Sequence, residues 1–394
     1  MLSSEVDVAR AWAESGGSWL TGERTGSPSA AGAGAAGVAE HLLRDVAGLV
    51  GEVPGLPTVA VLGERAALAG LQRDGARSCG GASRIVPTAD GHLVLTLARS
   101  DDLALVPALV ESPCLSGDPW LDVAAWALRS TSREAAARLH LLGLPGGAVG
   151  GAVGGSPVRV RDGGARVARE RPRVLDLSSL WAGPLCAHVL GLAGADVVKV
   201  ESTTRYDGAR RGHAAFYDLL HAGHRSVVLD FADPADRDRL QRLAASADVV
   251  VEASRPHALA RLGLDADALV TAGVTWVSIT AHGRGEPQRV GFGDDVAATA
   301  GLVGPGPVFV ADAVADPLTG LAAAAAALRS LRGPRAQLLD VSMAGVAAWA
   351  AAVPVPDGPP CPASRPSARR PSGTAPGPGA DTGAVLHDWL GELR

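Results

Sequence analysis

The sequence has few cysteines, few aromatic residues and almost no lysine, and it contains no long uninterrupted apolar run. Its four cysteines, Cys79, Cys114, Cys186 and Cys361, lie far apart and form no CxxC pair, which argues against a disulfide framework and a zinc site. No stretch suits a membrane span, and residues 1–17 lack the apolar core of a signal peptide. We therefore expect a cytoplasmic protein that binds no membrane.

Several familiar binding signatures are also missing. A formal net charge of −5 argues against a nucleic-acid partner. The ten histidines show no HExxH or similar spacing, so we expect no metal. Neither a P-loop nor a GxSxG motif is present. Glu201 ends an apolar run where a ribose-binding acid could lie, but without GxGxxG before it a dinucleotide site is not supported.

The second half of the chain alternates short Val/Leu/Ile runs with helical segments from residue 171 to residue 352. Continuous apolar runs separated by helices are typical of a parallel sheet covered on both faces. We predict an α/β fold here, a doubly wound, Rossmann-like sheet of about six strands that forms a large domain.

The remaining segments divide by composition. Residues 1–50 combine a Gly/Ala-rich loop with a helix, and residues 51–144 read as a smaller α+β domain placed N-terminally. Residues 145–170 are Gly-rich and predict a flexible linker, whereas residues 353–394 form a Pro-rich tail and a terminal helix. Within the small domain, the turn ADG between two β-rich runs predicts a hairpin.

Asp316 opens the longest stretch of strong helix formers, ADPLTGLAAAAAALRSLRG at 315–333. Asp316 suits the N-cap, Pro317 the first helical position and Gly333 the C′ position. The strand-like GPVFVAD before it predicts that the Asp316 carboxylate lies at a strand–helix junction on the rim of the sheet. The residues alone leave open whether Asp316 only caps the helix or binds a ligand.

Other charged groups compete for a functional role. Asp312, four residues earlier, is the closest rival of Asp316. The adjacent Asp294 and Asp295 start another predicted helix, and such neighbouring carboxylates are usually solvated.

A basic cluster follows the second predicted strand of the large domain. Arg205, Arg210 and Arg211, with His213, could form either a solvated loop or an anion-binding corner.

Several segments in this half resemble family III CoA transferases, the group of formyl-CoA transferase, carnitine CoA-transferase and α-methylacyl-CoA racemase. The similar segments follow the family's order and include VLDLSSLWAGPLCAHVLGLAGADVVKVES (174–202), RYDGARR (205–211), HAGHRSVVLDF (221–231), DVVVEASRPHALARLGLD (248–265), SITAHGRGEPQRVGFGDDVAATAGL (278–302) and DPLTGLAAAAAAL (316–328).

The N-terminal part resembles the same family out of order. The segments at 85–99 and 118–130 are similar to the family's small domain, which normally follows the Asp-bearing helix, and 13–28 is similar to the segment before that helix. The resemblance implies a circular permutation, or a duplicated member whose first copy lost its leading half. The family also implies an interlocked homodimer.

The resemblance implies that Asp316, with Gly320 in the D-x-x-x-G pattern, attacks an acyl-CoA thioester. Coenzyme A, as the substrate thioester, would be the only cofactor, and a carboxylic acid the second small-molecule partner. A reference pKa of about 3.9 and a helix N-terminus predict that Asp316 is ionised at pH 7. By family position, Gly80 and Gly81 are candidate oxyanion donors.

Residues similar in position to the family's CoA contacts come from the turns after the strands. They are Leu180, Trp181, Ala182, Arg210, Leu229, Asp230, Ala253, Ser254 and Arg261. In this set Arg210 and Arg261 would pair with the nucleotide phosphates.

The chain departs from the family at several positions. The usual E-N-F is Glu252-Ala253-Ser254, and His224 replaces the usual Lys, which puts the contacts to the nucleotide end in question. Phe292 stands where the racemase branch has a His, so racemisation, which needs an acid and a base, is disfavoured. Three hypotheses stay open: CoA transfer, another acyl transfer or hydrolysis of CoA thioesters, and a non-catalytic CoA-binding subunit.

Overall fold

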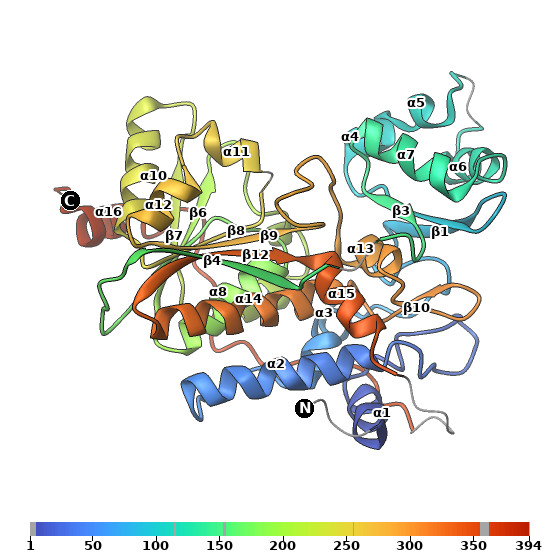
Figure 1. Ribbon diagram of the computed structural model, residues 1–394, viewed down its shortest axis with the longest axis horizontal. Helices are drawn as coiled ribbons and strands as arrows, with labels where there is room; N and C mark the ends of the chain where they lie inside the picture. The colour runs from blue at the N-terminus through green and yellow to red at the C-terminus, as the bar shows by residue number, and fades with distance from the viewer. Residues whose placement is uncertain (1–4, 114–115, 153–154, 255, 355–361, 394) are drawn as a thin grey trace.

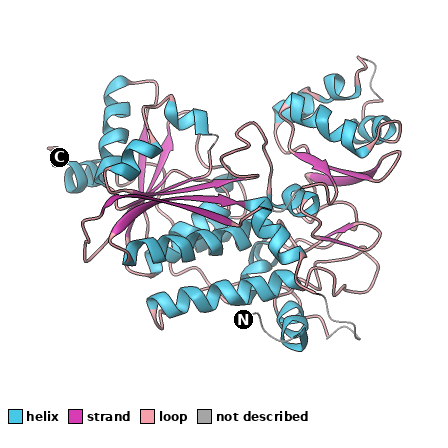
Figure 2. Ribbon diagram, viewed as in Figure 1, coloured by secondary structure: helices cyan, strands magenta, loops and turns pink. Residues whose placement is uncertain are grey.

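The computed structural model describes residues 5–113, 116–152, 155–254, 256–354 and 362–393. Cys114, Cys361 and part of the Pro-rich tail lie outside these ranges. The described residues form a large seven-stranded sheet, a separate three-stranded sheet and a two-stranded ribbon (Figure 2).

The large sheet has the strand order β4-β12-β9-β8-β5-β6-β7. Its strands are β4 (Val158–Ala165), β5 (Arg173–Asp176), β6 (Asp196–Ser202), β7 (Arg225–Leu229), β8 (Val249–Glu252), β9 (Thr275–Thr280) and β12 (Arg335–Ser342). Six of them run parallel, and β4 joins β12 antiparallel at one edge. The predicted α/β fold with its parallel sheet is confirmed. Strand order reverses between β5 and β8, which is where such sheets open a crevice for ligands.

Helices cover both faces of this sheet (Figure 1). One apolar core contains α8 (Ala182–Leu192), α14 (Ala315–Arg332) and α15 (Met343–Ala351), and the other contains α10 (Pro234–Ser246), α12 (Ala266–Thr271) and α16 (Thr382–Leu390). The two cores account for the continuous apolar character of the strands, because each strand is buried on both sides.

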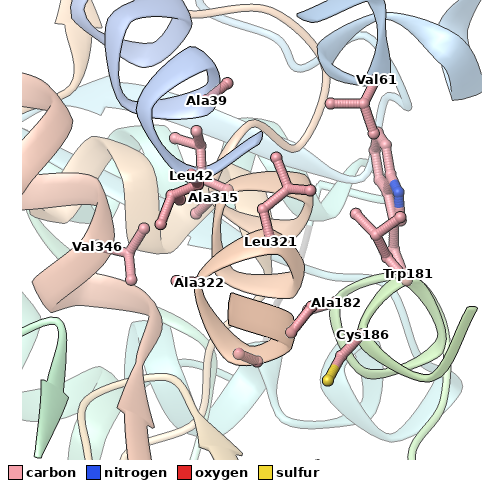
Figure 3. Packing of buried hydrophobic residues seen from close by; sticks show 14 of the residues in the cluster. Ala39, Leu42, Val61, Trp181, Ala182, Cys186, Ala315, Leu321, Ala322 and Val346 are labelled. Carbon is pink, nitrogen blue, oxygen red and sulfur yellow. The ribbon is translucent and has the colours of Figure 1, made fainter. Parts of the chain in front are cut away.

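Helix α14 occupies the centre of the first core. Its alanine run is buried between α8 on one side and α2 (Gly34–Val50) on the other. Figure 3 shows Ala39 and Leu42 of α2 on one side of α14 and Ala182 and Cys186 of α8 on the other. Small side chains let the three helices approach closely, so the alanine run of α14 forms the packing interface with α2 and α8.

The small domain packs α5 (Val106–Val110), α6 (Pro119–Ala127) and α7 (Ser132–Leu142) with the sheet of β1 (Ser83–Pro87), β2 (His92–Thr96) and β3 (Gly146–Ala148). The short helix α4 (Ser100–Ala104) precedes α5. The predicted hairpin is confirmed, since β1 pairs antiparallel with β2. The stretch 145–170 is more than a flexible linker, because β3 belongs to the small sheet and β4 to the large one.

The remaining elements are α1 (Glu5–Glu14), a 3-10 turn (Val59–Leu62), α3 (Glu64–Ala69), a 3-10 turn (Gly208–Arg211), α9 (Ala214–His221), α11 (Pro256–Ala260), α13 (Gly293–Thr299), β10 (Val303–Gly304) and β11 (Val308–Phe309). The strand expected before Asp316 exists as β11, but it pairs only with β10. The expected strand therefore does not join the large sheet, and the placement of Asp316 on the rim of that sheet stays a prediction.

Segments from the N-terminal part pack on the large domain. Val8 and Leu42 belong to the same buried core as Leu321 of α14. The domain bounds, the permutation and the interlocked homodimer stay predictions. Among the helices of the described ranges, none is long and apolar enough to cross a membrane.

Candidate functional site

Helix α14 begins two residues earlier than the sequence indicates, because its first helical residue is Ala315 and not Pro317. Val314 occupies the N-cap position and makes no side-chain capping bond, so Asp316 lies in the first turn and is not the cap. Gly333 ends the helix in extended geometry, at φ −83°, because the chain continues into β12. From Ala315 to Leu328 every residue except Asp316 is buried, which leaves Asp316 as the one side chain of this stretch that solvent can reach.

The backbone entering α14 is strained. Ala311 and Ala313 have φ values of 52° and 46°, a region that alanine rarely adopts and that costs on the order of 1–3 kcal/mol per residue. Neighbouring segments hold it in place. The Ala311 amide donates to Thr21 Oγ1 at 3.0 Å, and the Ala313 amide donates to Asp294 Oδ1 at 2.8 Å. Backbone strain held by such bonds is typical of functional sites.

Arg65 of α3 provides positive charge at this point. Its Nε donates to Asp312 Oδ2 at 2.8 Å and its Nη2 to Asp312 Oδ1 at 2.5 Å, while the guanidinium lies 5.4 Å from the centre of the Trp181 ring. Asp312 is fully buried. The rival of Asp316 is thus held in a two-pronged ion pair.

The tandem acids at the start of α13 are buried, and the expectation that they are solvated is wrong. Asp294 accepts the Ala313 amide, and Asp295 Oδ2 accepts Thr96 Oγ1 at 2.7 Å and the Phe292 amide at 3.0 Å. Burial raises the pKa of Asp294 to about 6 and that of Asp295 to about 7. The start of α13 therefore places two further carboxyl groups near the start of α14.

The pKa of Asp316 is raised to about 7, first because the surrounding protein desolvates the carboxyl although part of the residue stays open. Arg65 lowers this pKa, while Asp294 and Asp312 raise it, and a bond from the Gly293 amide lowers it. The expectation that the helix N-terminus keeps Asp316 ionised at pH 7 is corrected, because burial and like charge outweigh the helix dipole.

The two predicted oxyanion donors, Gly80 and Gly81, have different surroundings. A Cβ on Gly80 would lie 3.5 Å from Arg65 Nη2, so Gly80 is next to the cation of the site, whereas a Cβ on Gly81 would meet Arg77 at 2.9 Å. Cys79, just before them, donates to the Ala311 carbonyl at 3.2 Å, and burial raises its thiol pKa well above the usual range. This thiol is a structural contact to the strained segment.

Gly320, expected to share in catalysis, makes a packing contact. A Cβ at this position would lie 2.7 Å from the Ala182 carbonyl and 2.9 Å from Leu185 Cβ. The glycine lets α14 approach the start of α8, which brings Trp181 and Ala182 close to the helix that carries Asp316.

The turn after β5 rests on a buried ion network. Lys199, only 2% exposed, lies 3.0 Å from Asp207 and 3.4 Å from Asp176, and donates to the Ser178 carbonyl at 2.6 Å. Asp207 also accepts the amide of Leu180, which has φ 70° and is 40% exposed. The network fixes the turn that presents Leu180 to solvent.

Arg210 is less available to a phosphate than expected. Its Nε donates to Glu201 Oε1 at 2.9 Å, its Nη2 lies 2.5 Å from Oε2, and its guanidinium lies 4.5 Å from the Tyr217 ring centre. Glu201 thus balances the charge that the sequence assigns to a phosphate. Arg205 and Arg211 are exposed, and within the described ranges neither forms an ion pair.

The other predicted CoA contacts lie at the carboxyl ends of β7 and β8. Leu229 is buried, and Asp230 Oδ1 accepts the Ala232 amide at 2.9 Å. Ala253 is exposed, and the Ser254 amide donates to Glu252 Oε2 at 2.8 Å.

Arg261 is exposed on the turn between α11 and α12. The structure therefore brings Trp181, Ala182 and Gly80 towards Asp316 through Arg65 and Gly320. Most of the nucleotide-end residues follow the carboxyl ends of β6, β7 and β8. In the part of the chain that the structure describes, no group of three or more metal-ligating side chains could hold a metal.

Two charged side chains that organise these clusters escaped the sequence reasoning. Arg65 lies far from Asp312 in sequence, and nothing in its local pattern marks it. Lys199 did carry a signal, because it is a charged residue inside the apolar run DVVKVE, and a lysine in a doubly covered strand must be paired.

Comparison with known proteins shows which family this chain resembles. The model of CoA-transferase family III matches residues 171–375. A succinate–glutarate CoA-transferase of Agrobacterium fabrum is 30% identical over 201 residues, which are 44% of this chain and 50% of that protein. An acyl-CoA transferase of Fusarium pseudograminearum is 31% identical over 201 residues, 43% of this chain and 44% of that protein.

A crystal structure of a hypothetical protein from Mycobacterium tuberculosis is 33% identical, covering 46% of this chain and 57% of that one with a TM-score of 0.41. The chain spans about half the length of the curated relatives it matches.

Proposed function

The chain belongs to CoA-transferase family III, and from that premise we propose that it moves CoA between an acyl-CoA thioester and a carboxylic acid. The proposal makes Asp316 the nucleophile that carries the covalent intermediates. One observation supports it most. Asp316 is the only residue between Ala315 and Leu328 that is not buried, and it lies beside one cation and two further acids.

Comparison with Asp312 favours the same residue. Asp312 is fully buried, and both of its carboxylate oxygens are taken by Arg65. A nucleophile needs a free lone pair and room for the thioester carbonyl, so Asp316 fits this role and Asp312 fits that of an anchor for Arg65.

The reaction follows from carboxylate chemistry. An Asp316 oxygen attacks the thioester carbonyl, the C–S bond breaks, and CoA thiolate leaves from an acyl-aspartyl anhydride. The thiolate attacks the aspartyl carbonyl, which releases the donor acid and leaves an aspartyl-CoA thioester. The acceptor carboxylate attacks that thioester, giving a second anhydride, and the thiolate then takes the acceptor acyl group and frees Asp316.

Arg65 supports these steps by charge. Its guanidinium lowers the Asp316 pKa and lies next to Gly80, where oxyanions would develop. Because the other acids of the site raise the Asp316 pKa, Arg65 is the charged group that favours its ionised form, together with the Gly293 amide. We assign Arg65 as a positioning residue for the nucleophile.

The nucleotide end of CoA needs another assignment than the sequence indicates. Arg210 is committed to Glu201, whereas Arg205, Arg211 and Arg261 are exposed. We therefore assign phosphate binding to the exposed arginines, with Leu180 and Trp181 at the pantetheine side of the crevice.

The test is a panel of acyl-CoA thioesters and carboxylic acids assayed by mass spectrometry of the CoA products. Transfer by the wild-type chain and its loss in Asp316→Asn support the proposal. Thiol release without an acceptor acid supports hydrolysis instead, and CoA binding with no turnover supports a non-catalytic subunit. Full activity in Asp316→Asn contradicts the mechanism.

A further inference from the structure

The C-terminal segment 362–375 contains no helix or strand and connects parts that are far apart in the sequence. Near its start, the Ser364 amide donates to a carbonyl of α1 at 3.1 Å. At its end, the Ala375 amide donates to Asp218 Oδ1 of α9 at 2.8 Å. Arg369 lies between these two anchors, and its side chain is 16% exposed. The segment therefore holds the Arg369 side chain in a fixed place between the N-terminal part and the large domain.

Every nitrogen of the Arg369 guanidinium has a partner within the protein. Nε donates to Glu64 Oε1 at 2.6 Å and Nη2 donates to Glu64 Oε2 at 3.0 Å, which makes a two-pronged ion pair. Nη1 donates to the Gly55 carbonyl at 2.8 Å and lies 3.2 Å from His188 Nε2. Since a guanidinium has only donors, His188 Nε2 is the acceptor and the imidazole is neutral. Arg369 is therefore a bound cation and is not available to a phosphate of CoA.

The partner of Arg369, Glu64, is the first residue of helix α3 and is 1% exposed. Helix α3 has only six residues, and its N-cap residue, Gly63, makes no side-chain capping bond. So short a helix is not stable by itself, and its position depends on contacts with the rest of the protein. Pro366 of the C-terminal segment packs on Gly63, where an added Cβ would lie 3.0 Å from Pro366 Cβ. The C-terminal segment therefore holds the start of α3 at two consecutive residues.

The next residue of α3 is Arg65, the cation of the Asp316 site. Its guanidinium holds both carboxylate oxygens of Asp312 and lies over the Trp181 ring at the start of α8. Two adjacent residues of one short helix thus carry two ion pairs. Glu64 binds the C-terminal segment, and Arg65 binds the site. A shift of α3 would therefore move Arg65 away from Asp312.

We propose that Arg369 is a positioning residue for the Asp316 site. Through Glu64 it fixes the start of α3, and α3 then keeps Arg65 against Asp312 and beside Asp316. A residue 305 positions from Glu64 in the chain thus sets the charge around the nucleophile. This inference rests on the proposed function, because it takes Asp316 as the group that reacts in its ionised form.

The experiment measures the ionisation of Asp316 in the full chain by two methods. The first is the pH midpoint of the rate of CoA transfer. The second is a carbon NMR titration of the Asp316 carboxyl, assigned with Asp316→Asn, which needs no turnover. The charged groups that face Asp316 are Arg65 of α3, Asp294 and Asp295 of α13, and Asp312. Only Arg65 in this set belongs to the helix that the C-terminal segment holds.

Glu64→Leu separates the effect of position from the effect of charge. When α3 is released, Arg65 no longer supports the ionised form of Asp316. The midpoint should then rise by about half a unit to one unit, and the rate at pH 7 should fall about 2- to 5-fold. Charge alone predicts the reverse, because the variant removes an acid and leaves Arg369 unpaired. A midpoint that stays or falls overturns the proposal.

Arg369→Lys is the milder variant, and it decides the question if Glu64→Leu does not fold. Lysine keeps the charge but cannot form the two-pronged bond, so the midpoint should rise, though less than in Glu64→Leu. A wild-type midpoint in Arg369→Lys would show that only the charge matters and would overturn the proposal. Arg370→Gln, at the exposed neighbouring arginine, is the matched control and should change nothing. Circular dichroism checks the fold of each variant.

A double variant tests whether the effect passes through Arg65. Arg65→Gln alone should raise the midpoint, and adding Glu64→Leu should raise it no further. A further rise would show another route and overturn the proposal. A wild type that transfers no CoA would contradict the proposed function, whereas the NMR titration of Glu64→Leu would still decide the positioning role of Arg369.

Discussion

Two buried charge clusters of the large domain differ in how completely their charges are paired. At the end of β5 and β6, Lys199 lies within 3.4 Å of both Asp176 and Asp207, and Arg210 pairs with Glu201. At the start of α14, Arg65 binds Asp312 with both prongs, and the carboxyls of Asp294 and Asp316 keep raised pKa values near 6 and 7.

The difference is the one expected between a structural ion network and the nucleophile that we propose. In the Lys199 cluster the lysine charge lowers the pKa of Asp207 against burial, so folding stabilises its ionised form. In the Asp316 cluster burial and like charge raise the pKa, and the backbone at Ala311 and Ala313 is strained. The protein thus holds the carboxylates of Asp294, Asp295 and Asp316 in an unfavourable environment, which is typical of functional groups.

Asp316→Asn gives the sharpest contrast. It should lower the rate of CoA transfer by at least about 10³-fold, as expected for loss of a covalent nucleophile. It should also raise the free energy of unfolding by about 1 kcal/mol or more at pH 8. The folded-state pKa is above the unfolded value, so the wild-type penalty is full above pH 7 and absent below about pH 4.

Steady-state assays and urea unfolding at pH 4.5 and pH 8 measure both effects. Asp101→Asn, at an exposed acid of α4, is the matched control and should change neither. A variant that loses activity and also loses stability at pH 8 would contradict the idea that Asp316 is held in an unfavourable environment.

Lys199→Met should lower the free energy of unfolding, which is the opposite of the effect expected for Asp316→Asn. It leaves Asp176 and Asp207 buried without their cation, which costs about 3–5 kcal/mol of unfolding free energy. Adding Asp176→Asn and Asp207→Asn should recover much of that loss. Chemical unfolding followed by circular dichroism decides it, and a single variant as stable as the wild type would show that the network is not structural.

Gly320→Ala tests packing against catalysis at one position. The new methyl group would meet the Ala182 carbonyl and Leu185, which predicts a loss of about 1–3 kcal/mol in thermal unfolding. Gly333→Ala is the control at the other end of α14, where the nearest atom is 3.5 Å away and the loss should be small. Equal losses of stability in the two variants would show that Gly320 has no special packing role.

Asp294→Asn should shift the pH profile. The asparagine still accepts the Ala313 amide through Oδ1, but it removes a charge that raises the Asp316 pKa. The wild-type rate should rise with pH around pH 7, as Asp316 ionises, and the midpoint in the variant should move down by about half a unit to one unit. A midpoint that stays or rises would show that Asp294 does not act on the nucleophile.

The sequence predicted the parallel sheet and the helix of Asp316 because both depend on local patterns. Val/Leu runs covered on two faces mark β5 to β9, and the alanine run with Gly320 marks α14. Each of these signals lies within one segment.

The environment of Asp316 could not be predicted in the same way. Arg65, Asp294 and Thr21 meet α14 from segments far apart in the chain, and only the fold shows that they surround it. The sequence therefore made Asp316 the candidate nucleophile, which stays a prediction, but it predicted the wrong direction for the pKa shift of Asp316, because burial and neighbouring acids are not local properties.

The most direct measurement traps the covalent intermediate. The full chain is incubated with an acyl-CoA and hydroxylamine, digested, and mapped by mass spectrometry, with Asp316→Asn treated in parallel. The account predicts a hydroxamate at Asp316 that appears only during turnover and is absent from the variant. A hydroxamate at Asp312 or Asp294, or CoA transfer with no modified aspartate, would contradict it.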